Sequence, residues 1–172
     1  MKLKNIKIFN YRCFKDAEID FDDHITLVVG KNGAGKTAIL DTIAVSVSTF
    51  LLGIDGGVSR SILKEDARYE FHNLNGTIDP QHQFPVIIET MGNCLNRSDI
   101  KWTRSLNSES GKTTVKEAGE LTGLAKKAQN QIMTGDKSLV LPLISYYGTG
   151  RLYAQKKEKR NLKSLTEFKR QV

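Results

Sequence analysis

Eight consecutive residues match the pattern GxxxxGK[ST], and they are Gly30, Lys31, Asn32, Gly33, Ala34, Gly35, Lys36 and Thr37. Glycine permits positive φ and leaves no Cβ in the way, so successive backbone N–H groups can turn toward one anion, and we expect this of all three glycines. The lysine supplies a positive charge for β- and γ-phosphates, and the Thr37 hydroxyl is an oxygen ligand that suits Mg²⁺. The pattern therefore predicts a site for a nucleoside triphosphate with Mg²⁺, which we extend by one residue to Ala38.

The loop has the neighbouring elements that this motif requires. Residues 25–29 are an almost continuous apolar run, which is typical of a strand covered on both faces in a parallel sheet. Residues 36–52 place apolar side chains three and four positions apart, which predicts an amphipathic helix. The positive end of that helix would face the same anion as the loop.

Further strands and helices are predicted on both sides of this unit. Residues 3–9 and 17–21 alternate apolar and polar side chains, which indicates two half-buried strands before the loop. After the loop helix, we expect a short helix near 62–67, hairpin strands at 84–91 and 100–106, a third strand at 113–116, a helix at 117–133 and a buried strand at 139–147. The predicted fold is an α/β P-loop NTPase with a mixed sheet, in which antiparallel strands flank the loop and the parallel core is incomplete.

Charge divides the chain of 172 residues into two parts. The net charge is +7, and residues 151–172 contribute +6 of it. We therefore expect a nucleotide-binding lobe at 1–150 and a basic segment at 151–172 that leads into a missing remainder. No apolar run reaches the length of a membrane span, and the N-terminus lacks the pattern of a signal peptide. We expect a cytoplasmic protein without a membrane partner.

Residues that could catalyse hydrolysis are scarce. Hydrolysis needs a carboxylate on a second strand to hold Mg²⁺, and the one candidate is Glu89, which is more typical of a solvent-facing strand position. His24, His72 and His82 do not have the spacing of metal ligands. We assign no catalytic residue, and we expect the chain to bind nucleotide but to hydrolyse it negligibly.

The sequence resembles a known family of ATPases. Residues 6–14, the acidic stretch after them and the loop at 30–37 are similar to the N-terminal part of ABC-type heads of the SMC, RecF and overcoming-lysogenization-defect group. Residues 62–68 and 142–151 resemble bacterial AAA-family ATPases described as predicted ATP-binding proteins involved in virulence, relatives of the Septu and retron ATPase PtuA. The resemblance covers most of residues 1–153.

The resemblance implies a function and a set of ligands. It implies that ATP and Mg²⁺ are the cofactors, that Arg12 approaches the phosphates and that Asn32 faces the γ-phosphate. It also implies dimerisation with ATP clamped between two heads, and catalytic parts further along a longer chain. An anti-phage or nucleic-acid-processing system, an HNH-type partner nuclease and a nucleic-acid contact are the partners that such a head would serve. Tyr11 or Phe14 could form a platform for adenine.

Two alternatives remain open at this point. One is a small P-loop kinase that phosphorylates a metabolite, although the two strands before the loop are unusual for that class. The other is a nucleotide-sensing interaction module without turnover.

Overall fold

The main sheet has four strands, and all neighbouring pairs are antiparallel, in the order β2-β1-β5-β6. The computed structural model describes residues 1–74, 77–136 and 138–148, so the predicted basic segment at 151–172 lies outside the described residues. The bounds of the four strands are Lys2–Tyr11 for β1, Phe14–Asp20 for β2, Val86–Cys94 for β5 and Arg97–Leu106 for β6. The two predicted strands before the loop and the predicted hairpin are confirmed.

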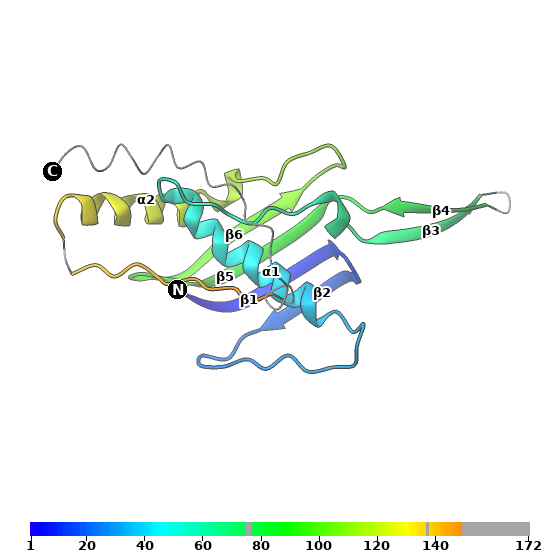
Figure 1. Cartoon of the computed structure of the whole chain (residues 1–172), viewed down its shortest axis with the longest axis horizontal. Helices are drawn as coiled ribbons and strands as arrows, with labels where there is room; N and C mark the ends of the chain where they lie inside the picture. The colour runs from blue at the N-terminus through cyan, green and yellow to red at the C-terminus, as the bar shows by residue number, and fades with distance from the viewer. Residues whose placement is uncertain (75–76, 137, 149–172) are drawn as a thin grey trace, which may run out of the picture.

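Alternation of apolar and polar residues gives this sheet one buried face. Ile6 and Ile8 of β1 are fully buried, and the register places Ile8 opposite Ala17 of β2 and Ile88 of β5. A strand presents successive side chains to opposite faces, so these residues share the face that packs in the core. Figure 1 shows α1 crossing the sheet.

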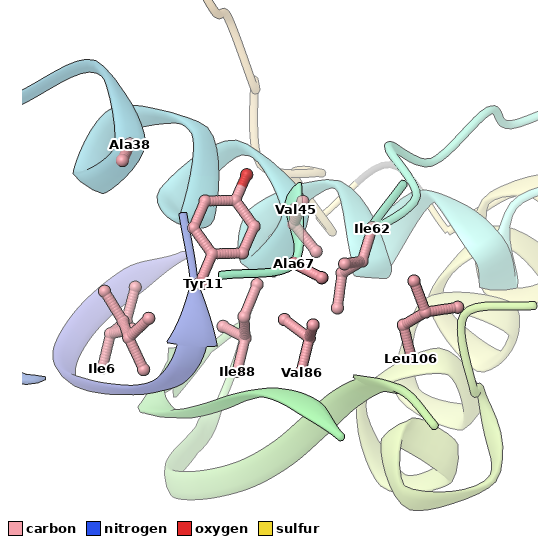
Figure 2. Close-up of a cluster of buried hydrophobic side chains, with 10 residues drawn as sticks. Ile6, Tyr11, Ala38, Val45, Ile62, Ala67, Val86, Ile88 and Leu106 are labelled. Atoms are coloured by element: carbon pink, nitrogen blue, oxygen red, sulfur yellow. The ribbon is translucent and has the colours of Figure 1, made fainter. Parts of the chain in front are cut away.

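Helix α1 (Lys36–Ser48) and the 3₁₀ helix η1 (Thr49–Gly53) confirm the helix predicted at 36–52. Figure 2 shows Val45 of α1 on the side of Val86 and Ile88 of the sheet, and Ala38 of α1 belongs to the same core cluster. The stretch Lys36–Gly53 is apolar and long enough to cross a membrane by length and composition, but half of it is buried inside the fold. The same property is found in core helices, and here it reflects packing against the sheet.

A second cluster forms where α2 (Gly119–Met133) meets η1 and β6. Leu121 and Ala125 of α2 are fully buried, and they pack with Phe50 of η1 and Trp102 of β6. The 3₁₀ helix η3 (Lys116–Ala118) leads directly into α2, so the helix predicted at 117–133 is confirmed.

A two-stranded hairpin that we did not predict projects from one end of the sheet (Figure 1). It consists of β3 (Tyr69–Leu74) and β4 (Thr77–His82), and the short helix predicted near 62–67 precedes it as η2 (Lys64–Asp66). Pro80 in β4 obscures the strand pattern, because proline cannot donate a ladder hydrogen bond. The Asn75-Gly76 pair in the sequence is a strong hairpin signal that could have revealed it.

Three strand predictions are wrong. Residues 25–29, 113–116 and 139–147 form no strand in the structure. Leu27 is 82% exposed and Leu143 is 94% exposed, so neither run is buried on both faces, although Leu141 and Ile144 pack against the second cluster. An apolar run forms a strand only where neighbouring strands satisfy its backbone, and no described strand pairs with either run. The α/β fold is confirmed, but the predicted parallel strands are not formed in the described part of the chain.

Candidate nucleotide-binding site

The loop between residues 30 and 37 is shaped by two of its three glycines. Gly33 and Gly35 have positive φ values of 85° and 89°. The expected positive φ is wrong for Gly30, which does not adopt that conformation. A Cβ on Gly35 would lie 2.7 Å from Sγ of Cys13 and 2.7 Å from Cζ of Phe14, so the loop packs tightly on the turn that joins β1 to β2.

Helix α1 begins at the end of this loop without a side-chain cap. Gly35 is the N-cap in a left-handed conformation, and the first turn contains no acidic residue. The early N–H groups of a helix lack partners within the helix, and its N-terminus carries partial positive charge. The start of α1 therefore favours an anion next to the loop.

Lys36 places its ammonium over the loop. Its Nζ atom donates hydrogen bonds to the carbonyl oxygens of Gly30 at 2.7 Å and Lys31 at 2.8 Å. Thr37 is exposed, so its hydroxyl is accessible to a ligand. The side chain of Ala38 is 4% exposed and packs in the core, so this predicted site residue offers a ligand only its backbone.

The predicted site residues from 31 to 34 are all exposed. This set comprises Lys31, Asn32, Gly33 and Ala34. The backbone of Ala34 donates to the carbonyl of Lys31 at 3.2 Å, which closes a turn within the loop. The loop therefore presents an accessible rim to a ligand, while Gly35 and Ala38 fix its base against the fold.

Arg12 lies in the turn against which the loop packs, and its φ is 49°. Its Nη1 atom lies 2.6 Å from Oδ2 of Asp41, while its Nη2 and Nε atoms lie 2.8 Å and 2.9 Å from Oδ1 of Asp66. Burial alone would lower the pKa of Arg12, but the hydrogen bond to Asp66 and the nearby negative charges raise it overall. Arg12 is thus a fixed cation beside the loop, held by two carboxylates.

The second oxygen of Asp41 binds two further groups. Oδ1 of Asp41 lies 3.0 Å from Nη2 of Arg60 and accepts a hydrogen bond from the Tyr146 hydroxyl at 2.5 Å. The Arg60 guanidinium also stacks over the Tyr146 ring, 5.3 Å from its centroid. Sequence reasoning did not find Asp41, Asp66 or Arg60. Asp41 is the only acidic residue of α1 and follows Thr37 by four positions, which was the available sign for it in the sequence.

Asp66 is held in place by the end of β1. The backbone N–H of Arg12 donates to the Asp66 carbonyl at 2.7 Å, and an isolated bridge pairs Tyr11 with Ala67. The Asp66 side chain also accepts from the backbone N–H of Leu63 at 2.9 Å. These contacts fix the position of the Asp66 carboxylate, which binds the Nη2 and Nε atoms of Arg12.

The other candidate residues offer no ligand group at the loop. Thr90 bonds to Ser46 of α1 at 2.9 Å, so the preceding residue, Glu89, points to the opposite face of the sheet and not toward Thr37. Tyr11 is fully buried and presents no surface to adenine, while Phe14 packs under the loop. No group of three potential metal-binding His, Cys, Asp or Glu side chains occurs among the described residues.

The comparison with protein families agrees with this geometry. Residues 5–172 match the model of the AAA domain. The chain belongs to the AAA domain family. The expected resemblance to the N-terminal part of an ABC-type ATPase head is thereby confirmed, and with it the P-loop fold class.

Known proteins similar to this AAA domain include repair and retron ATPases. It is 30% identical over 89 residues to the DNA replication and repair protein RecF of Clostridioides difficile strain 630, covering 51% of this chain and 22% of the relative. It is 22% identical over 164 residues to the Retron Vc95 probable ATPase of Vibrio cholerae serotype O1 biovar El Tor, covering 92% of this chain and 30% of the relative. A solved SMC ATPase structure aligns with a TM-score of 0.46 and 18% identity over 73% of this chain and 80% of that one. The AAA domain therefore spans less than a third of the length of these two sequence relatives.

Proposed function

We propose that this AAA domain binds ATP with Mg²⁺ at residues 30–38 and serves as the N-terminal lobe of an ABC-type ATPase. The observation that carries the proposal is the loop itself, where the uncapped start of α1 and the ammonium of Lys36 face one accessible surface. Backbone N–H groups, a helix N-terminus and a lysine charge together favour a polyphosphate. Thr37 is the residue that would hold Mg²⁺ beside it.

Isothermal titration calorimetry of the purified chain tests this proposal. We expect binding of ATP in the presence of Mg²⁺ and weaker binding when EDTA removes the metal ion. ATP affinity that does not depend on Mg²⁺ would contradict the role of Thr37. The absence of ATP binding under both conditions would contradict the whole proposal.

We propose further that the chain alone does not hydrolyse ATP at an appreciable rate. Glu89, which the sequence offered as a Mg²⁺ ligand, faces away from the loop, and Asp41 and Asp66 are engaged by arginines. A phosphate-release assay should give a rate close to that of a blank. Rapid release would show that a carboxylate of this chain reaches the metal ion, whereas transfer to an added small metabolite would favour the kinase alternative.

We propose that hydrolysis takes place in an assembly of two heads in the cytoplasm, serving a nucleic-acid-processing or defence system with a partner nuclease. The names of the repair and retron relatives support such a role. The exposed apolar side chains within residues 25–29 and 139–147 support an assembly, because other chain segments could cover them. Light scattering with and without ATP measures the step from one head to two.

A further inference from the structure

We propose that Asp41 is a positioning residue, which holds Arg12 beside the phosphate loop through one carboxylate oxygen and Tyr146 through the other. ATP binding and the position of the segment around Tyr146 are then coupled through one side chain. This inference rests on the proposed ATP site, and it adds a residue and a form of regulation to it.

Asp41 lies on α1, close to the proposed ATP site. Thr37 and Asp41 are four residues apart, so they lie on the same side of the helix, separated by about 6 Å along its axis. The carboxylate is therefore one helical turn from the proposed Mg²⁺ ligand. The Asp41 side chain is 6% exposed, and a buried carboxylate is stable only with such charged or hydrogen-bonding partners.

Arg12 is held by two carboxylates and still has N–H groups for a phosphate. The turn that carries Arg12 touches the loop through Cys13 and Phe14 at Gly35, and its guanidinium lies 2.6 Å from Asp41, one helical turn after Thr37. Guanidinium has five N–H groups; Nε donates a hydrogen bond to Asp66, and the two terminal nitrogens form ion pairs with Asp41 and Asp66. Within the described part of the chain, one N–H on each terminal nitrogen remains for another acceptor. The side chain is 32% exposed, so a phosphate oxygen can reach it.

Tyr146 is hydrogen-bonded to the same carboxylate that holds Arg12. This residue belongs to a segment without helix or strand, and its hydroxyl joins that segment to α1 through Asp41. Arg60 binds the same oxygen and covers the Tyr146 ring. Since a phosphate that attracts Arg12 weakens its hold on Asp41, the carboxylate then interacts more strongly with Arg60 and Tyr146.

The Asp41→Asn variant tests the positioning role, because it keeps the size of the side chain and one carbonyl oxygen but removes the charge. Calorimetry should show a loss of ATP affinity of about tenfold, similar to the loss in Arg12→Ala. The double variant should lose no more than Arg12→Ala alone, because both changes remove the same interaction. A matched control is Asp79→Asn on the exposed hairpin, which removes an equal charge and should leave ATP affinity unchanged.

The outcomes separate the two proposals. If the wild-type chain does not bind ATP, the proposed function fails. If it binds ATP and the losses from Asp41→Asn and Arg12→Ala add together, the positioning role is overturned. Should Asp41→Asn unfold, Asp66→Asn gives the second measurement, since it removes the partner of two Arg12 nitrogens, and an unchanged ATP affinity there would also overturn the role.

Hydrogen exchange tests the coupling to Tyr146. In the wild-type chain we expect ATP to change the exchange of the peptide that covers residues 141–148. The same peptide should not respond to saturating ATP in Tyr146→Phe, which loses only the hydroxyl. An equal response in both proteins, or none in the wild type while ATP is bound, would overturn the coupling.

Discussion

The Nζ atom of Lys36 lies 2.7 Å from the carbonyl oxygen of Gly30, at the opposite end of the same loop. A second hydrogen bond to Lys31 keeps the ammonium over the loop rather than in solvent. The charge is therefore already placed where the phosphates are proposed to bind, and little side-chain entropy remains to be lost on binding.

Lys36→Ala should weaken ATP binding by at least 100-fold, because charge-assisted hydrogen bonds to phosphate are among the stronger polar interactions. Calorimetry with Mg²⁺ measures the effect. Lys101→Ala removes the same charge from an exposed position on β6, and we expect it to bind ATP like the wild type. Equal affinities in the wild type and Lys36→Ala would contradict the assigned role.

Alanine at Gly35 should destabilise the fold more than alanine at Gly33. Both positions have positive φ, which costs an L-residue about 1–2 kcal/mol. At Gly33 a Cβ meets nothing within 4 Å, whereas at Gly35 it would overlap Cys13 and Phe14. Urea unfolding should show a drop of about 1–2 kcal/mol for Gly33→Ala and a larger drop for Gly35→Ala. Similar values for the two variants would show that the turn can move away from the loop.

The two cysteines should differ in their reaction with a thiol reagent. Cys13 is exposed, while Cys94 is 1% exposed and burial raises the pKa of its thiol, so little thiolate is present. Ellman's reagent should modify one thiol in the folded protein and both in urea. Modified Cys13 should also weaken ATP binding, because its Sγ atom lies under Gly35. Release of two equivalents from the folded chain would contradict this assignment.

Tyr146 should make stability depend on pH in the alkaline range. Burial, followed by the hydrogen bond to Asp41 and its negative charge, raises the pKa of Tyr146 above the ordinary value of 10.0. The folded state thus binds this proton more tightly than the unfolded state. The resulting stabilisation is fully present below pH 10 and is lost as pH rises through the higher folded pKa.

Urea unfolding of the wild type and Tyr146→Phe between pH 8 and pH 12 measures this dependence. We expect the variant to be less stable by about 1 kcal/mol at pH 8, and the difference to shrink at the alkaline end. Tyr147→Phe is the control, since it removes a hydroxyl from the neighbouring, 74% exposed side chain. A constant difference across the range would contradict the linkage.

The sequence pattern correctly predicted the elements that pack one face against elements adjacent in the sequence. The α1 helix and the β5–β6 hairpin carry a clear period and contact adjacent elements, so their positions follow from the chain itself. The runs at 25–29 and 139–147 have an equally strong apolar character, but a strand needs at least one neighbouring strand, and no described strand pairs with either run. The strand propensity of a segment does not show whether a neighbouring strand is available to pair with it.

The candidate site also has one part that the sequence predicted and one part that it did not. The loop was found because its function fixes residue types at fixed spacing within eight positions. The cluster around Asp41 was not, because its members are distant in sequence. Arg12, Arg60 and Tyr146 reach Asp41 only when β1, the loop after η1 and the last described segment fold around α1.

Trp102 is the single tryptophan of the chain, and its Nε1 atom donates to the carbonyl oxygen of Ser46 at 3.1 Å. Ser46 lies near the end of the helix whose first residue is Lys36. Indole emission responds to hydrogen bonding and local polarity, so this side chain is an intrinsic fluorescent reporter for the helix. Any ligand that shifts α1 against the sheet should change the emission spectrum without an added label.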